Sequence, residues 1–279
     1  MSVLWLGAYV HVPLALELML QNESGRAARY FHHREYTLIP LAISLVVAFA
    51  TGIGWLALPW LIFTTACAGF GVWRLLSQGL RRPGALADWG LLWFGVSGAW
   101  IFASAMRWEV FGFPHIIVLL AGVHQLYAGL VLQVLASRIV AARPGRLPWI
   151  TAICVSLGNP FVATGILTSH LGMPLWIEFA AVCFYASSVV VLGWMQLFLA
   201  LWPKSGLPWY SRALLVVSDL SLGTAMTLAL IFMWGVRRGY PTLTIPEMIA
   251  WHGSLNAFGF GLCALAGWSL AGTRHAKQP

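Results

Sequence analysis

The segment IPEMIAWHGSLNAFGFGLCALAGWSLAG (residues 245–272) is long enough to cross a membrane as one helix. A transmembrane helix needs about 20 mainly apolar residues, and Glu247 is the only fully charged residue in this stretch. His252 and Asn256 nevertheless lie near its middle, where polar side chains are costly against lipid. The segment therefore predicts a membrane-spanning helix whose polar residues face the interior of a helical bundle.

The rest of the chain has the same character. Of its 279 residues, 60% are hydrophobic and only 9% are charged, and the mean hydropathy is +0.81. Soluble domains carry about 25% charged residues, so the composition excludes a soluble fold. The apolar runs are long and continuous, unlike the short alternating strands of a membrane β-barrel. We predict an all-α, polytopic membrane protein with a single helical domain over residues 1–279.

Nine apolar runs approach the length of a membrane span, and only short loops separate them. The second run is short, and its boundary with the third lies near Gly52 and Gly54. The predicted spans are residues 3–21, 37–53, 55–76, 87–106, 114–137, 148–168, 175–202, 213–236 and 246–271.

The basic residues predict the orientation of these spans, because Lys and Arg favour the cytoplasmic side. With an outer N-terminus, only Arg107, Arg237 and Arg238 of the sixteen lie outside. We therefore expect a cytoplasmic C-terminus, a location in the bacterial inner membrane, and no nucleic-acid partner despite the net charge of +8. The basic residues expected inside are Arg26, Arg29, Arg34, Arg74, Arg81, Arg82, Arg138, Arg143, Arg146, Lys204, Arg212, Arg274 and Lys277.

Several carboxylates lie within or at the ends of the predicted spans. Glu17 and Asp219 are several residues inside, where an ionisable group costs at least about 2.5–3.5 kcal/mol. We expect each either to have a functional role in the bundle interior or to pair with an arginine of a cytoplasmic loop. Glu178 and Glu247 lie near outer ends and are interpreted as caps of helix N-termini; Asp88, at the start of its span, is interpreted similarly.

Histidines and asparagines form a second polar set at middle depth. His252 and Asn256 are four residues apart and share one helix face. His124 and Tyr127 are three residues apart, which predicts either a proton donor–acceptor pair or an interhelical hydrogen bond. The set comprises His11, His124, His252, Asn159 and Asn256.

Prolines beside polar residues predict an internal pocket. Pro13 follows His11 closely and Pro160 follows Asn159 directly, so both helices are expected to bend at membrane depth. Deep aromatic rings can stabilise a cation in such a pocket. We expect the polar residues of the first, fifth, eighth and ninth spans to converge on one enclosed chamber. The expected substrate-binding residues are His11, Asn159, Trp100, Trp194 and Trp251.

Two of these stretches carry a resemblance to a known family. GVHQLYAGL (122–130) and HGSLNAFGF (252–260) resemble signatures of the YndJ-like family, and VHVPLALEL (10–18) is similar to it as well. Its members are bacterial integral membrane proteins, often described as transporters without a mechanism. The resemblance implies that His124, His252 and Asn256 form a shared polar core. Gln125 departs from the pattern, because the family is expected to have an aromatic residue there.

A weaker resemblance is one of type only. The chain is similar in size, buried carboxylates and aromatic content to the membrane-embedded terpene cyclases of bacterial indolosesquiterpenoid pathways of the xiamycin type. Such enzymes protonate an epoxide or alkene with a buried acid. No diagnostic motif supports this resemblance, and the DDxxD and DxDD motifs of the soluble terpene cyclases are absent.

The favoured interpretation is a membrane-embedded enzyme of the isomerase or lyase type. A carboxylic acid buried in an apolar site stays protonated and can act as a general acid. We expect Glu17 or Asp219 to protonate a lipophilic polyprenyl or terpenoid substrate drawn from the lipid bilayer. Tyr127 or Asn256 would orient the substrate, and His124 or His252 would accept the final proton. This acid-initiated cyclisation or isomerisation involves no redox step, so no cofactor is expected.

Two other functions stay open at this point. The first is a proton-coupled permease, because acids and histidines at several depths can relay protons. The second is a metal or haem site formed by His11, His124 and His252, since imidazole is a common metal ligand. No two of these histidines share a helix at ligand spacing, and the four cysteines show no metal-binding pattern. We therefore expect no bound metal.

Overall fold

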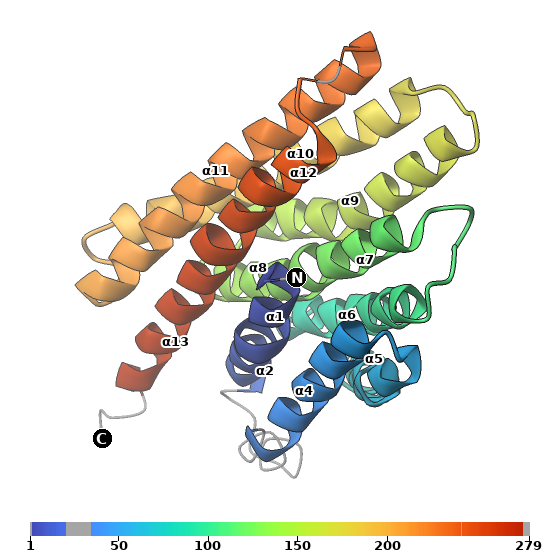
Figure 1. The fold of residues 1–279 in the computed structure, drawn as a ribbon. Helices are drawn as coiled ribbons and strands as arrows, with labels where there is room; N and C mark the ends of the chain where they lie inside the picture. Colours follow the sequence, from blue (N-terminus) through green and yellow to red (C-terminus); the bar gives the residue numbers. More distant parts are fainter. Residues whose placement is uncertain (1, 21–34, 241, 276–279) are drawn as a thin grey trace. The chain divides into compact units, whose positions relative to one another are not determined.

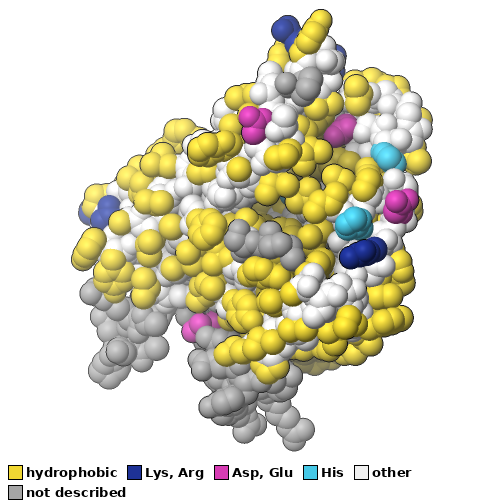
Figure 2. All heavy atoms as spheres, in the orientation of Figure 1, with side chains coloured by type: hydrophobic (Ala, Val, Ile, Leu, Met, Phe, Trp, Pro, Cys, Tyr) yellow, Lys and Arg dark blue, Asp and Glu magenta, His cyan; other side chains and the backbone are white. Residues whose placement is uncertain are grey.

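The computed structural model describes residues 2–20, 35–240 and 242–275. Helices dominate these residues, and no strand is assigned within them. On the face drawn in Figure 2, hydrophobic side chains are spread over much of the surface and charged ones are few. Such a surface suits a lipid environment. Four of the basic residues expected on the cytoplasmic side lie outside the described residues: Arg26, Arg29, Arg34 and Lys277.

The predicted spans are confirmed as helices. Eight helices in the described ranges are long and apolar enough to cross a membrane, and the second predicted run forms a shorter apolar helix over Leu38–Thr51. Each predicted boundary lies within a few residues of the observed one. In chain order the elements are α1 (Ser2–Leu6), η1 (Gly7–His11), α2 (Val12–Leu20), α4 (Glu35–Thr51), η2 (Gly54–Ala57), α5 (Leu58–Gln78), α6 (Gly84–Ala105), α7 (His115–His124), η3 (Gln125–Val131), α8 (Leu132–Ala142), α9 (Arg146–His170), α10 (Trp176–Leu201), α11 (Trp209–Arg238), α12 (Ile245–Met248), η4 (Ile249–Gly253), η5 (Leu255–Leu262) and α13 (Cys263–His275).

The helices belong to two compact units, residues 1–137 and 138–279, and the boundary lies within α8. In the first unit α5 packs along α6, which also packs against α7 and η3. Trp60 and Phe94 fill the core between α5 and α6 with ring centroids 5.8 Å apart, and both are fully buried. A Cβ at Gly98 would lie 1.9 Å from Thr64 Oγ1, so this close approach requires glycine.

In the second unit each helix packs on the next one along the chain. α10 lies between α9 and α11, and α11 also packs against η5 and α13 (Figure 1). Small residues again permit the contacts: a Cβ at Gly158 would lie 2.5 Å from the Tyr185 ring, and one at Gly259 would lie 2.3 Å from Ser221 Oγ. Small residues at helix interfaces are typical of membrane proteins, since they let backbones approach closely.

Three of the spans contain π-helical turns, and these turns coincide with the polar residues singled out above. η1 ends at His11, η3 contains Tyr127, and η4 and η5 contain His252 and Asn256. At η1 the Val12 N–H donates to the Gly7 carbonyl, directly before Pro13. A π-helical turn therefore lies next to the proline at which the sequence predicted a bend. At Pro160, by contrast, α9 continues through the proline without interruption.

Candidate functional site

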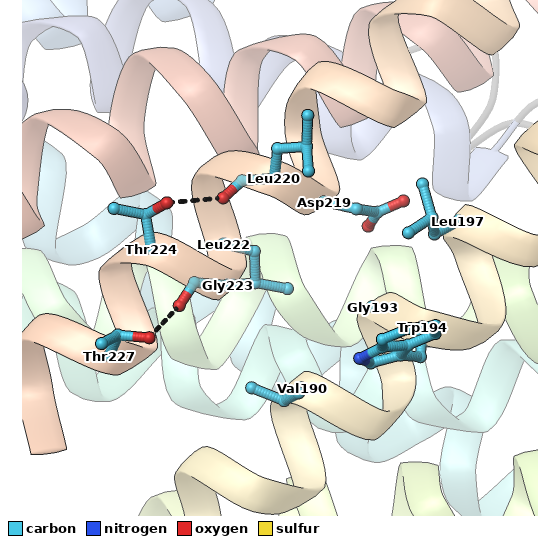
Figure 3. A pocket seen from close by; sticks show the side chains of 10 residues that line it. All are labelled: Val190, Gly193, Trp194, Leu197, Asp219, Leu220, Leu222, Gly223, Thr224 and Thr227. Atoms are coloured by element: carbon cyan, nitrogen blue, oxygen red, sulfur yellow. Dashed lines mark hydrogen bonds between the residues drawn. The ribbon is translucent and has the colours of Figure 1, made fainter.

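A half-open groove runs between α10 and α11 in the second unit (Figure 3). Its volume of about 430 Å³ lies within the range of ~300–1,000 Å³ that is typical of small-molecule sites. Most of its lining is apolar, and the polar side chains come from α11 alone. The lining residues are Val190, Gly193, Trp194, Leu197, Asp219, Leu220, Leu222, Gly223, Thr224 and Thr227.

The groove lies away from both ends of α11. Asp219 is ten residues from the first residue of the helix and nineteen from the last. At 1.5 Å per residue, these separations correspond to about 15 Å and about 28 Å. Because α11 is a candidate membrane span, these distances place the groove at hydrocarbon depth.

Asp219 is the acidic group of the groove. It is 8% exposed, and its side chain is directed toward α10 (Figure 3). Oδ1 accepts a hydrogen bond of 2.9 Å from Gln196 Nε2. The other oxygen, Oδ2, is buried, and no described residue donates a hydrogen bond to it. Nor does any described lysine or arginine pair with Asp219. A charged carboxylate is costly at this depth, so the arrangement favours a neutral carboxylic acid.

A buried hydrogen-bond network contacts Asp219 through Gln196. Gln196 is 1% exposed, and its Oε1 accepts a hydrogen bond of 2.9 Å from Trp268 Nε1 on α13. Ser218 Oγ donates to the Phe260 carbonyl at 3.2 Å and lies 3.5 Å from Gln196 Nε2. The network therefore links α10, α11, η5 and α13 at the acid. The signal for Gln196 was present in the sequence as an amide within an apolar run.

His252 and Asn256 share one face, as predicted, and make a second link to α11. His252 Nδ1 lies 2.8 Å from the Ala225 carbonyl, which can only accept, so Nδ1 carries the hydrogen. His252 Nε2 then accepts from Asn256 Nδ2 at 3.1 Å, and this amide also donates to the His252 carbonyl at 2.9 Å. These bonds make the pair an interhelical connection, and neither residue lines the groove.

In the first unit His11 packs against Tyr127. The two ring centroids are 5.0 Å apart in an edge-on arrangement, and both side chains are buried. His11 Nδ1 lies 3.1 Å from the Leu6 carbonyl, and the Tyr127 hydroxyl donates to the Val3 carbonyl at 2.8 Å. His124 is exposed whereas Tyr127 is buried, so the two residues lie in different surroundings. The π-turn η3 starts directly after His124 and changes the helical spacing on which the shared face predicted for them rested.

The remaining predicted residues lie in different surroundings. Glu17 is half-buried on α2, and Asn159 is 1% exposed on α9. Trp100 is half-buried, with its ring 6.4 Å from that of Phe111. Trp251 is 64% exposed on η4 and does not line the groove, whereas Trp194 does. The groove thus brings together two of the predicted residues, Asp219 and Trp194.

A buried ion pair near the start of α6 was missed from the sequence. Asp88 is fully buried and forms ion pairs with Arg74, whose Nε lies 2.8 Å from Oδ1, and with Arg82. The interpretation of Asp88 as a residue of a helix N-terminus did not anticipate these partners. Arg74 is 3% exposed and belongs to α5, not to a loop. The signal was an arginine inside an apolar run.

Of the two acids interpreted as helix caps, Glu247 caps its helix as predicted, whereas the start of α10 has no side-chain cap and Glu178 bonds a residue of α9 instead. Glu247 and Thr244 form a reciprocal capping box at the start of α12. Glu178, in the first turn of α10, accepts a hydrogen bond from Ser169 near the end of α9. Within the described part of the chain, no three His, Cys, Asp or Glu side chains lie close enough together to hold a metal ion.

Comparisons with known proteins place the chain in a family. The family model described as "YndJ-like protein" matches residues 2–260. The "Uncharacterized membrane protein YndJ" of Bacillus subtilis is 28% identical over 264 residues, a match that covers 93% of this chain and 46% of that protein. The chain therefore spans about half the length of this relative. No solved structure matches this chain. The chain is a multi-pass membrane protein of the kind found in the bacterial inner membrane, and it belongs to the YndJ-like family.

Proposed function

We propose that the chain is an intramembrane enzyme in which Asp219 donates a proton to a lipophilic polyprenyl or terpenoid substrate. One observation carries the proposal: Asp219 lines a half-open groove on a membrane-spanning helix, and its buried Oδ2 atom has no hydrogen-bond donor among the described residues. A substrate dissolved in the bilayer reaches such a groove from the side and needs no aqueous path. The volume of about 430 Å³ suits one small lipophilic molecule.

The proposed reaction is an isomerisation, so the substrate and the product contain the same atoms. The neutral acid transfers its proton to an epoxide oxygen or an alkene carbon, which opens the C–O bond or the C=C bond and creates a carbocation. A second double bond of the substrate attacks the cation and forms a new C–C bond. Loss of a proton to the Asp219 carboxylate restores the acid and releases an isomer of the substrate. The exposed ring of Trp194 lines the groove and can stabilise the cation by about 0.5–2 kcal/mol.

A chemical probe tests the acid without knowledge of the natural substrate. Dicyclohexylcarbodiimide is lipophilic and modifies carboxyl groups in their protonated form. We expect mass spectrometry of the labelled membranes to find the adduct on Asp219, and no adduct there in Asp219→Asn. Gly223→Leu should protect Asp219, because a side chain at Gly223 enters open space in the groove. Gly69→Leu is the matched control, because a Cβ at Gly69 would also meet nothing within 4 Å, but this glycine lies on α5, away from the groove.

Turnover is tested with terminal epoxides of farnesol and geranylgeraniol, incubated with the purified protein. The proposal predicts products of unchanged mass from the wild-type protein and from Glu109→Gln, whose carboxyl is exposed in a loop. Asp219→Asn should form these isomers at least ~100-fold more slowly, the contribution typical of general acid catalysis. Equal rates for Asp219→Asn and the wild-type protein would exclude Asp219 as the proton donor.

A proton-coupled permease is the second candidate. It is favoured by the π-helical turns around His252 and Asn256, because irregular turns inside a span often accompany functional sites. Transport predicts that proteoliposomes with an internal pH-sensitive dye acidify when a substrate gradient is applied, and that Asp219→Asn abolishes this signal. An enzyme predicts isomer formation in detergent micelles, where no gradient exists.

A further inference from the structure

The orientation of the Gln196 amide is determined by its two neighbours. Trp268 Nε1 can only donate a hydrogen bond, so the Gln196 atom 2.9 Å away must be the oxygen. The single hydrogen of Ser218 is donated to the Phe260 carbonyl, so the Gln196 atom that faces Ser218 must be the nitrogen. Both constraints place the amide nitrogen, a donor without acceptor capacity, toward Asp219.

This orientation determines which oxygen of Asp219 can hold the proton. Oδ1 accepts the hydrogen bond of 2.9 Å from Gln196 Nε2 and therefore acts as the carbonyl oxygen of a neutral carboxyl group. With the hydrogen on Oδ1, this atom would be the hydroxyl oxygen, which accepts a hydrogen bond from the amide more weakly than a carbonyl oxygen does. The acidic hydrogen consequently belongs on Oδ2, the atom without a donor among the described residues.

We propose that Gln196 and Trp268 are positioning residues that hold the acidic hydrogen of Asp219 on Oδ2 and leave Oδ1 as the acceptor of the Gln196 amide. Neither residue lines the groove, and both act through the acid. Gln196 is 1% exposed and Trp268 is 7% exposed, so the surrounding helices hold the chain of bonds in one geometry. The inference rests on the proposed function, because it concerns the same proton.

Infrared difference spectroscopy measures this arrangement directly. The C=O stretch of a neutral carboxyl group falls in wavenumber when its oxygen accepts a hydrogen bond. The Asp219 band is the one lost in Asp219→Asn. We expect Gln196→Met to move this band to higher wavenumber, because Oδ1 loses its donor. Trp268→Phe should split the band, because the Gln196 amide can then adopt both orientations.

The double variant distinguishes positioning from packing. If Trp268 acts only through Gln196, Gln196→Met combined with Trp268→Phe gives the band of Gln196→Met alone. In Trp268→Phe, the rate of carbodiimide labelling of Asp219 should fall by about fivefold, the factor that corresponds to a neutral hydrogen bond of ~1 kcal/mol. Trp209→Phe, at a 78% exposed tryptophan of α11, is the control and should change neither measurement.

The possible failures are separable. An unshifted Asp219 band in both Gln196→Met and Trp268→Phe would overturn the positioning role, while labelling of Asp219 in the wild-type protein would still support the proposed acid. If no carboxylic-acid band disappears in Asp219→Asn, Asp219 is ionised at neutral pH, and both the positioning role and the proposed function fail.

Discussion

Asp88 and Asp219 show how partner choice determines the state of a buried carboxyl group. Asp88 pairs with two arginines and is fully buried, which suits a permanently charged structural group. Asp219 receives one bond from a neutral amide and keeps one oxygen without a donor among the described residues. The same side chain is therefore held as an ion in the first unit and favoured as an acid in the second.

This contrast predicts different costs for the same substitution. Asp88→Asn leaves the buried Arg74 without its carboxylate partner, and breaking such a pair costs about 3–5 kcal/mol of the free energy of unfolding. Asp219→Asn retains an oxygen that can accept from Gln196, so we expect a loss of less than about 1 kcal/mol. Thermal unfolding in detergent micelles compares the two variants. Equal losses would contradict the assignment of distinct roles.

At the scale of helices, contacts depend on glycines at particular positions. α5 and α6 approach so closely that Gly98 lies directly against Thr64. Gly69 lies on the same helix pair, yet a Cβ there would meet nothing within 4 Å. Substitution of Gly98 therefore tests the close packing of the two helices, whereas substitution of Gly69 tests helix propensity alone.

We expect Gly98→Ala to destabilise the protein by about 1–3 kcal/mol, the usual cost of overpacking a core. Gly69→Ala should instead be neutral or should stabilise the helix by up to about 1 kcal/mol, because alanine favours helix more than glycine does. Unfolding midpoints of the two variants, measured side by side, check this difference in sign. Equal destabilisation at both positions would mean that α5 and α6 are not packed as observed.

At the scale of the whole molecule, the two units share one feature of helix packing. In each unit a buried acid on one long helix is held by a side chain from the preceding helix: Arg74 of α5 bonds Asp88 of α6, and Gln196 of α10 bonds Asp219 of α11. In each unit the acid-bearing helix then packs against a span with π-helical turns. The two acids thus differ in the charge of the partner that holds them.

The spans and the position of Asp219 could be predicted from the sequence because both depend on local composition. A run of apolar residues indicates a membrane helix, and a carboxylate within it stands out. The partners of the acids could not be predicted, because Arg74 with Asp88 and Gln196 with Trp268 are contacts between different helices. The prediction for His124 and Tyr127 assumed a regular helical spacing, which a π-turn interrupts. The predicted single chamber involves residues of both units and stays a prediction.

The membrane orientation is the remaining prediction for the whole chain. The excess of basic residues on one side predicts that the loops after α5 and α10 are cytoplasmic and that those after α6 and α9 face outward. In a variant without the four free cysteines, single cysteines at exposed loop positions report the side of each loop. Glu109→Cys and Leu171→Cys should react with a membrane-impermeant maleimide in intact spheroplasts. Leu80→Cys and Pro203→Cys should react only after permeabilisation. Labelling of the second pair in intact cells would reverse the orientation and would place Asp219 nearer the outer surface.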